Sequence, residues 1–398
     1  MKKGLLKPLC LVMAILVAVG ILPTGTVFAD SMEKTLFPLW VEGVQITSEN
    51  KGNILGDGKV RFDSENGVLF LSDGATVKSA VVSVYSDAEF VEYETCIASE
   101  LEYLTVRISG NVTLKLPEKA KGDSAGLISG GDTLICGKGT LNISGGDACK
   151  NASFGLVSVG TLTVEDGIEI NATGGNNASV SLGILAYLGA ELQEGVSVNA
   201  KGGNAEKLSA GIYCYLRRPL TVDGASLTCE GGNAEESVGI CADLISVKSG
   251  ELVAKGKSHG LQPVSNLTAK LSAHSGNLEA YGEKGAMLRT EITAANGMTA
   301  LISTAEQSEF ITWDGQLPLD SDSVTAVQID FEAFESPLGD VNGDGGVDSL
   351  DAALILQADA GLASLDGEQL ISADINADGT ADALDAAYIL KLDAGLIK

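Results

Sequence analysis

The chain is poor in the residues from which most enzymes build acid–base and nucleophilic sites. It contains two histidines, His259 and His274, and two tryptophans among 398 residues, and aromatic residues make up 5% of it. No two aspartates are adjacent anywhere in the chain. Two isolated histidines do not supply a Ser-His-Asp triad, and no pair of carboxylates stands out as the pair that glycoside hydrolysis requires. The sequence therefore offers no recognisable catalytic set.

Basic residues are also scarce. The chain has 26 Lys and Arg against 53 Asp and Glu, and its net charge is −27. Residues 1–29 contribute +3, and the segment from Asp340 onward has 12 acids and 2 bases, or −10, which leaves −20 for the middle. A protein this acidic does not bind nucleic acid or anionic lipid through general electrostatics. The acidity of the middle suits solubility, whereas the acids near the C-terminus recur at fixed spacings.

Long apolar runs are absent except at the N-terminus. Three lysines precede a mostly apolar stretch at residues 9–22, and Val27-Phe28-Ala29 offers small residues at the recognition positions of a cleavage site. An apolar run this short, followed by a cleavage site, predicts a removed signal peptide at residues 1–29 rather than a membrane anchor. We therefore expect a secreted, extracellular protein with no membrane span in its mature chain.

The chain has seven cysteines, of which Cys10 lies in the predicted signal peptide. An even number of remaining cysteines in an exported protein permits disulfides. Their spacing fits no zinc pattern, however, and several stand where a buried apolar residue is expected. We favour free, packed thiols over disulfides for the remaining six, which are Cys96, Cys136, Cys149, Cys214, Cys229 and Cys241.

The middle of the chain is an internal repeat of about 28 residues. Segments of the form Ser-apolar-Gly-apolar place glycines at positions 126, 155, 183, 211 and 239, at intervals of 29, 28, 28 and 28 residues. A second marker, Gly-Gly followed by Asp or Asn, keeps the same interval at 145–147, 174–176, 202–204 and 231–233. Alternating segments such as Ile168-Glu-Ile-Asn171 predict about three short strands per repeat. No single repeat buries its apolar face alone, so successive repeats must stack with parallel ladders between them.

The beginning of the predicted mature chain fits the same architecture. Leu39-Trp40-Val-Glu-Gly43 and the strand Gly67-Val-Leu-Phe-Leu71 precede the repeats and would cap the open first coil. Together with the Gly-Ile-Tyr and Gly-Gly-Asn coils, these segments resemble a group of secreted clostridial repeat proteins described as carbohydrate-binding β-helix domains. The resemblance covers roughly residues 36–300 and implies a β-helix that acts in polysaccharide catabolism.

Two near-copies of a calcium loop close the chain, and they start 34 residues apart, at Asp340 and Asp374. Oxygen-bearing side chains stand at loop positions 1, 3, 5, 9 and 12, glycine stands at position 6, and position 7 offers a backbone carbonyl. This EF-hand-like set of hard donors predicts two Ca²⁺ ions, one in each loop. Position 12 is Asp rather than Glu, each loop runs into a short apolar helix, and no obvious helix enters it. The predicted metal ligands are Asp340, Asn342, Asp344, Gly346, Asp348 and Asp351, and Asp374, Asn376, Asp378, Thr380, Asp382 and Asp385.

Paired loops at this spacing resemble a type I-like dockerin over about 60 residues. The resemblance implies docking onto a cohesin domain of a scaffoldin and recruitment to a cellulosome or a cell-surface complex. In that family, loop positions 10 and 11 help to choose the cohesin, and here they are Ser349-Leu350 and Ala383-Leu384. The two pairs differ only at their first residue, so the copies are expected to offer two similar, roughly two-fold-related faces to one cohesin.

These patterns predict a mainly β fold, a right-handed parallel β-helix of about seven to nine coils, followed by a small α-helical calcium-binding dockerin domain. The predicted boundaries are a signal peptide at 1–29, an N-terminal cap at 30–75, β-helix repeats at 76–317, an end cap and linker at 318–338, and the dockerin at 339–398.

The predicted β-helix has two open functions. Binding of a plant or host polysaccharide needs exposed aromatic rings beside polar side chains. Tyr187 and Tyr215 stand 28 residues apart at equivalent turns, where they would lie one above the other about 4.8 Å apart. They lie near the basic pair Arg217 and Arg218, although such a stack is also ordinary solenoid packing. The alternative is a polysaccharide lyase or glycoside hydrolase, which we regard as less favoured than a binding or structural role.

Overall fold

The structure is a computed structural model that describes residues 34–397. Within that span it leaves out residues 87–88, 121, 150, 216–217, 266–267, 274, 295–298, 305–306, 313–324, 333–337, 345, 366 and 377–379. The predicted signal peptide and Cys10 lie outside the described residues. The chain divides into two compact units, a solenoid unit (Met1–Thr293 with Leu301–Asp330) and a helical unit (Ala294–Ala300 with Phe331–Lys398).

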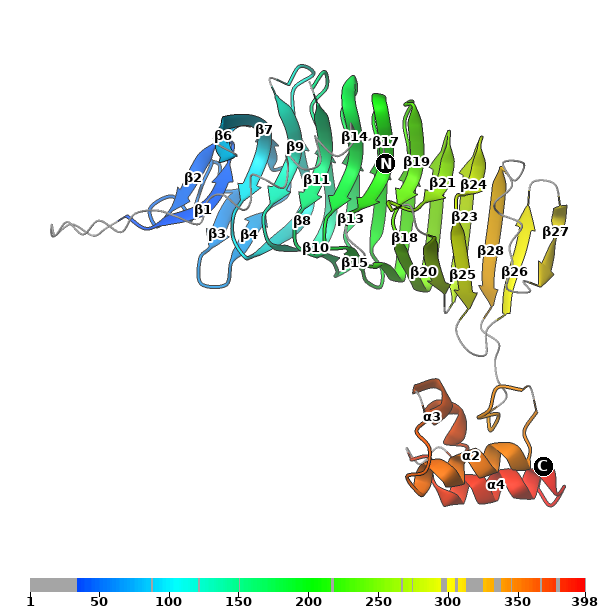
Figure 1. The fold of residues 1–398 in the computed structure, drawn as a ribbon. Helices are drawn as coiled ribbons and strands as arrows, with labels where there is room; N and C mark the ends of the chain where they lie inside the picture. The colour runs from blue at the N-terminus through cyan, green and yellow to red at the C-terminus, as the bar shows by residue number, and fades with distance from the viewer. Residues whose placement is uncertain are drawn as a thin grey trace. The chain divides into compact units, whose positions relative to one another are not determined.

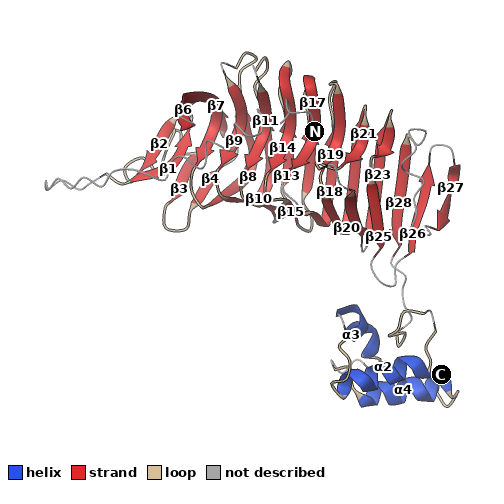
Figure 2. Cartoon of the chain, viewed as in Figure 1, coloured by secondary structure: helices blue, strands red, loops and turns tan. Residues whose placement is uncertain are grey.

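The solenoid unit consists of β-strands that stack in successive coils (Figures 1 and 2). The first sheet has the strand order β2-β1-β7-β9-β11-β14-β17-β19-β21-β24, with β6 paired to β7. Its strands are β1 (Leu36–Val41), β2 (Val44–Thr47), β6 (Ala80–Ser86), β7 (Glu89–Ser99), β9 (Asp123–Ser129), β11 (Ala152–Ser158), β14 (Ala178–Ala186), β17 (Ala205–Cys214), β19 (Glu236–Cys241), β21 (His259–Gln262) and β24 (Gly285–Met287).

The second sheet holds the remaining strands of the coils and of the two ends. They are β3 (Val60–Asp63), β4 (Val68–Leu71), β5 (Thr76–Lys78), β8 (Tyr103–Lys115), β10 (Asp132–Ser144), β12 (Leu162–Val164), β13 (Glu169–Thr173), β15 (Ala190–Leu192), β16 (Ser197–Lys201), β18 (Leu220–Glu230), β20 (Leu244–Gly256), β22 (Ala269–Ala273), β23 (Gly276–Gly282), β25 (Thr290–Ala294), β26 (Thr299–Thr304), β27 (Gln307–Thr312) and β28 (Ala326–Glu332).

One repeat contributes three short strands, as the sequence predicts. β11, β12 and β13 form one coil and β14, β15 and β16 form the next, whereas elsewhere the last two strands merge into one long strand such as β18. The parallel register joins Ser153 to Ser181 and Ser181 to Ser209, so one 28-residue interval is one turn of the coil. The predicted parallel β-helix is confirmed, as a β-solenoid of about seven turns.

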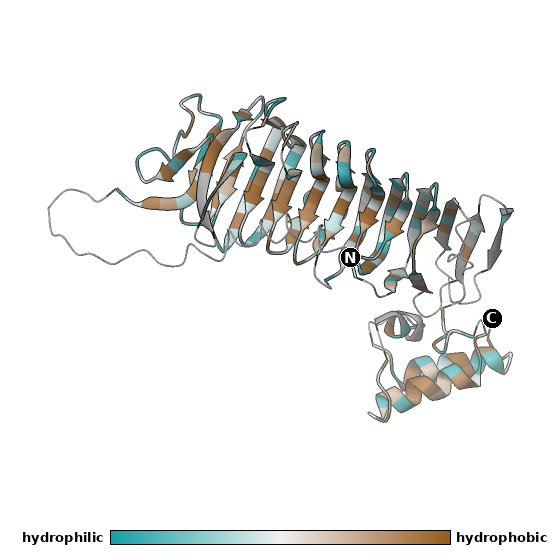
Figure 3. Cartoon of the chain, turned by 45° about the horizontal axis from the view of Figure 1, so that its top comes forward, coloured by the Kyte–Doolittle hydropathy of each residue, from teal (hydrophilic) through white to brown (hydrophobic). Residues whose placement is uncertain are grey.

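Apolar side chains fill the inside of the coils. β13 buries Ile170 and Ala172 and leaves the alternate residues Glu169, Asn171 and Thr173 partly exposed, which is the period-2 pattern of a half-buried strand. Each such Ile, Leu or Val side chain stabilises the fold by about 1.5–3 kcal/mol. Because the same residue type recurs at the same register, the hydrophobic residues form bands that cross successive strands (brown in Figure 3).

A serine in each repeat explains why both sequence markers keep the same interval. The Ser181 hydroxyl donates to the Gly175 carbonyl at 2.7 Å and accepts from the Gly203 N–H at 2.8 Å. Ser153 and Ser209 make the same pair of bonds one coil earlier and one coil later. Glycine is required in these turns, because a Cβ at Gly175 would lie 2.0 Å from a backbone oxygen. The serine of the Ser-x-Gly marker therefore hydrogen-bonds to the Gly-Gly turns, which is why the two markers recur together.

Antiparallel strands cover the first coil. β1 pairs with β2 and with β7, where Leu39 and Val41 lie opposite Ser99 and Ile97. β6 pairs with β7 farther along the same strand, and β3 pairs with β4. These pairings satisfy backbone groups of β7 that would otherwise form an open edge. The segment around Trp40 therefore pairs along the edge of β7.

The helical unit contains α2 (Ser349–Asp359), α3 (Gly367–Ala373) and α4 (Ala383–Asp393). α2 and α4 follow the two loops, as predicted, and bury the equivalent residues Ala352 with Ala386 and Ile355 with Ile389 in one apolar cluster. The expectation that no helix enters the loops is wrong for the second loop, because α3 ends directly before Asp374. Seven residues carry little periodicity, so α3 depends on its packing rather than on a sequence signal.

Candidate functional site

The first loop, residues 340–351, folds back on its own backbone. Asp340 is 2% exposed, and its Oδ1 accepts from the N–H groups of Gly343 and Asp344 at 2.8 and 3.2 Å. Oδ1 of Asn342 accepts from the Asp344 N–H at 2.8 Å, and Oδ1 of Asp344 accepts from the Gly346 N–H at 2.9 Å. The side-chain oxygens of positions 1, 3 and 5 therefore lie along one tight turn of backbone.

Asp351, at loop position 12, ties the beginning of the loop to the helix that follows. It is fully buried, and its Oδ1 accepts from the N–H groups of Val341 and Asn342 at 2.8 and 2.9 Å. Its Oδ2 accepts from the Asp348 N–H at 2.9 Å, while Asp348 caps α2 by accepting from the Leu350 N–H at 2.7 Å. The two aspartates form a capping box, and one carboxylate holds both ends of the loop.

The second loop, residues 374–385, repeats this geometry at position 12 and at the helix cap. Asp385 is fully buried and accepts from the N–H groups of Asn376 and Asp382 at 3.1 and 2.9 Å. Asp382 caps α4 by accepting from the Leu384 N–H at 2.7 Å. The bonds from Asp348 and Asp382 and the two helix caps have equal lengths in the two copies, so the 34-residue sequence repeat is also a structural repeat where each loop meets its helix.

The donors of both loops suit a hard cation. Asp351 and Asp385 are fully buried carboxylates, and the bonds described for them come from backbone N–H groups. The ion pairs described for the chain all lie outside the loops. Burying a carboxylate away from a cation is costly, and an all-oxygen donor set is the kind that Ca²⁺ takes. Of the other predicted ligands, Asp374 is half-buried and Thr380 exposed, and Asp378 lies outside the described residues.

Equivalent leucines are exposed on α2 and α4. Leu350 and Leu384, at loop position 11, are 62% and 66% exposed, and the neighbouring Ser349 and Ala383 are exposed as well. Two further exposed pairs, which the loop motif alone does not single out, follow at the same 34-residue interval: Leu356 with Leu390, and Leu362 with Leu396. The 34-residue interval between the two copies is the sequence signal that could have identified these leucine pairs. Exposed apolar residues repeated in this way are typical of a surface that a partner protein covers.

The solenoid residues predicted to bind carbohydrate come together only in part. The rings of Tyr187 and Tyr215 stack with centroids 4.7 Å apart and an angle of 20°, as their equivalent positions predict. The ring of Tyr213 lies 6.4 Å from that of Tyr215, and both pack on one apolar cluster. Arg218 is exposed, and Arg217 lies outside the described residues. Stacked, half-buried rings leave little ring face for a sugar.

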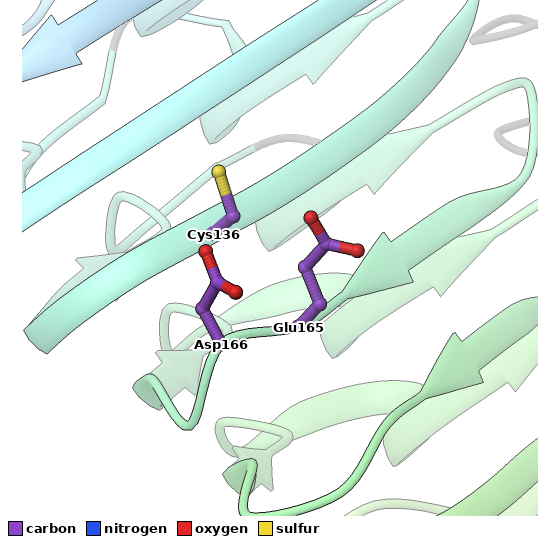
Figure 4. A group of neighbouring side chains, drawn as sticks. All are labelled: Cys136, Glu165 and Asp166. Carbon is purple, nitrogen blue, oxygen red and sulfur yellow. The ribbon is translucent and has the colours of Figure 1, made fainter.

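A second group of candidate metal donors lies on the solenoid. Cys136, Glu165 and Asp166 each bring one ligand atom within 4.8 Å of the others (Figure 4). Burial raises the pKa of the Cys136 thiol, against the opposing charge of Arg107, and the two carboxylates raise it further. The thiol is therefore protonated at neutral pH, whereas a metal takes the thiolate. A metal bound at this group would therefore have to displace the thiol proton.

The six cysteines that the structure describes are free and buried, as the sequence analysis favours. Burial raises the pKa of these thiols and so keeps them protonated and unreactive; the pKa of Cys214 is raised to about 12. Buried thiols of this kind act as small apolar residues of the core.

Comparison with known proteins adds one assignment. Residues 338–391 match the family model of the dockerin type I domain. No curated protein and no solved structure matches the chain. No helix in the described part of the chain is long and apolar enough to cross a membrane. Type I dockerin domains bind calcium and dock onto cohesins in cellulosome-type assemblies. The duplicated loops, the capped helices and the family match agree that this chain carries a dockerin type I domain at residues 338–391, preceded by a β-solenoid.

Proposed function

We propose that the protein is a secreted component of a cellulosome or a cell-surface complex, recruited when its dockerin domain binds Ca²⁺ and docks onto a cohesin of a scaffoldin. The observation that carries this proposal is the structural repeat. Each copy has a buried aspartate at position 12, a capped helix and an exposed leucine at position 11. Two ions are proposed, one in each loop, held by the twelve loop positions that the sequence predicts.

The two copies are proposed to offer two equivalent faces to one cohesin. Leu350 and Leu384 stand at the same place in the first turn of their helices, and their exposures, 62% and 66%, are nearly equal. A cohesin that covers one face should therefore also accept the other after a rotation of the domain. The neighbouring residues Ser349 and Ala383 would distinguish the two orientations only weakly.

Surface plasmon resonance of the full chain against a panel of cohesins tests this proposal. We expect binding in Ca²⁺ and none in chelator. Leu350→Asp and Leu384→Asp, each alone, should leave binding to the matching cohesin within a few-fold, and the double variant should abolish it, because a carboxylate buried against an apolar partner surface is strongly unfavourable. Leu370→Asp is the matched control, because Leu370 is 49% exposed on α3 and stands outside the duplicated helix starts. Loss of binding in either single variant would refute the two-face arrangement, and binding by the double variant would place the cohesin site elsewhere.

For the solenoid we propose carbohydrate binding, or a structural role, in polysaccharide catabolism. What supports this is the repeated polar turn pattern, together with the small supply of groups for acid–base chemistry. His259 is half-buried with its Nδ1 3.2 Å from Oε1 of Gln262, and His274 lies outside the described residues. Retention of the protein on a polysaccharide array tests the binding role. Release of reducing or unsaturated ends in the same samples would instead favour the alternative, a lyase or a glycoside hydrolase.

A further inference from the structure

Two neighbouring hollows lie along one corner of the solenoid. A cavity of about 430 Å³ is lined by the turns at 115–118, 144–147, 173–176 and 201–204 and by Gly232. A second, of about 640 Å³, is lined by the turns at 230–231, 255–257 and 281–283 and by Thr325. Their linings adjoin at residues 230–232, and the two hollows together, which we call the corner groove, lie along seven successive turns. Six intervals of about 4.8 Å give it a length of roughly 29 Å.

The floor of the corner groove is bare backbone whose N–H groups are already bonded. In each double-glycine turn, the N–H of the first glycine donates to a carbonyl of the next coil. The N–H of the second donates to the serine hydroxyl that clamps the turns, and the pairs are Gly146 to Ser124, Gly175 to Ser153, Gly203 to Ser181, and Gly232 to Ser209. A floor without free N–H groups does not cradle a phosphate and does not add a peptide strand. Recognition in this groove therefore depends on the side chains of its rims.

Both rims are ladders of polar side chains. Strand register places one residue of each coil on the first rim, in the order Ser144, Thr173, Lys201, Glu230, Lys255 and Tyr281. On the second rim, Asp147, Asn176 and Asn204 each accept through Oδ1 from the backbone N–H of the equivalent residue of the next coil, at 2.6, 3.0 and 2.9 Å. These rims present hydrogen-bond donors and acceptors at the interval of the coils.

The corner groove is neutral within an acidic chain. Its lining includes four bases, Lys115, Lys201, Lys255 and Lys257, and four acids, Glu118, Asp147, Glu230 and Glu283, so its net charge is 4 − 4 = 0. The whole chain, in contrast, carries −27. A balanced mixture of donors and acceptors suits hydroxyl groups, which do both, better than it suits a polyanion.

The length and the direction of the groove further limit its ligand. The groove runs across the strands, so its polar groups recur about every 4.8 Å, whereas an extended peptide repeats every 3.3 Å or so and would lose register within a few residues. A sugar ring in an extended glycan has a length similar to one interval of the coils. At one end, Tyr281 is 36% exposed with Lys255 Nζ 5.4 Å from its ring centroid, which offers a face on which a sugar can stack.

We propose that the corner groove binds a neutral, linear polysaccharide, with about one sugar beside each turn, hydrogen-bonded to both rims and stacked on Tyr281. This inference rests on the proposed carbohydrate-binding role of the solenoid and gives that role a site and a ligand class. It also moves the site away from Tyr187 and Tyr215, whose rings stack on each other.

Affinity gel electrophoresis of the full chain tests the proposal with three soluble probes: hydroxyethyl cellulose, arabinoxylan and polygalacturonate. Thr173→Trp fills the middle of the groove with a bulky side chain. Thr163→Trp is its matched control, because Thr163 is also half-buried on the same coil but does not line the groove. We expect retardation by at least one neutral probe, weakened at least about tenfold by Thr173→Trp and unchanged by Thr163→Trp, since tenfold corresponds to the loss of one or two hydrogen bonds.

Tyr281→Ala, at the exposed end of the groove, provides a second variant that does not depend on accommodating a tryptophan, and it should weaken the same probe. Wild-type retardation that neither Thr173→Trp nor Tyr281→Ala reduces would overturn the corner groove and leave carbohydrate binding by the solenoid standing. Retardation by polygalacturonate alone would overturn the neutral ligand class. If no probe retards the wild type, both the groove and the carbohydrate-binding role fail, while docking to cohesin is unaffected.

Discussion

Replacing Asp351 by alanine should unfold the dockerin domain without affecting the solenoid. The carboxylate of Asp351 is fully buried and accepts three backbone N–H groups at 2.8–2.9 Å. Hydrogen bonds to a charged group contribute about 1.5–3 kcal/mol each, so the variant loses on the order of 5 kcal/mol. A unit of this size has only about 3–9 kcal/mol of stability in total, at 0.05–0.15 kcal/mol per residue. The variant therefore removes most or all of the stability of the domain.

Calcium should increase the difference in stability between the wild-type domain and Asp351→Ala. Binding adds about 2.7 kcal/mol to the native domain when the free ion is at a hundred times its dissociation constant, and Asp351 is a predicted ligand of the first ion. Asp385→Ala should cost less, because the structure describes two N–H groups on that carboxylate rather than three. The order of stability expected in Ca²⁺ is wild type, then Asp385→Ala, then Asp351→Ala.

Differential scanning calorimetry of the full chain measures this, because the two compact units should give separate transitions. Only the transition of the dockerin domain should move with Ca²⁺ and chelator. Asp359→Ala is the control, since Asp359 is an exposed acid at the last position of α2 and lies outside the loop. A calcium-dependent transition at the same temperature in Asp351→Ala and in wild type would refute the role given to this carboxylate.

Two further predictions concern the solenoid. Ser181→Ala should lower the free energy of unfolding by about 2–4 kcal/mol, because it leaves the Gly203 N–H and the Gly175 carbonyl without a partner. The control is Ser179→Ala, which should change the free energy of unfolding little because Ser179 is partly exposed. Urea denaturation monitored by circular dichroism measures both variants. Burial raises the pKa of the Cys214 thiol from 9.0 to about 12 in the folded protein. Above pH 9 the thiol therefore ionises in the unfolded chain before it does in the folded one, and the fold loses about 1.4 kcal/mol of stability per pH unit. Cys214→Ala should therefore show a shallower loss of stability between pH 9 and 10.5, and an equal slope in the two proteins would contradict it.

The solenoid could be predicted because each repeated residue lies next to its equivalent in the following coil. Glycines 28 residues apart become adjacent when the chain coils, so a constant interval in the sequence is a constant register in the sheet. The bond between Ser181 and Gly203 could not be predicted, since the two residues stand 22 positions apart and the intervening sequence gives no sign of which turn the hydroxyl reaches. The corner groove was missed for a similar reason: its rims consist of ordinary polar residues that become a surface only once the register is known.

In the dockerin domain, the loop pattern predicts donors from their spacing, and it missed features that depend on packing. Asp340 and Asp351 are recognisable because calcium loops need oxygen at fixed positions. α3 has no such requirement and holds its place through contacts, including the bond from Gln369 Nε2 to the Val341 carbonyl at 3.1 Å. The exposed Leu356 and Leu390 were overlooked because a lone leucine on a helix surface is common, and only its recurrence in both copies makes it informative.

The carboxylate at position 12 connects the proposed calcium loop to the start of the helix that is proposed to dock. Asp351 closes the loop through Val341 and Asn342, and through Asp348 it also fixes the first turn of α2. That turn carries Leu350, so the orientation of the exposed leucine depends on the residue that is predicted to bind the ion. A glutamate at this position would reach farther, whereas the shorter aspartate keeps the loop and the helix start in direct contact. If calcium and cohesin bind as proposed, calcium dependence of docking needs no conformational change at a distance, because one side chain holds both the proposed ion and the turn that carries Leu350.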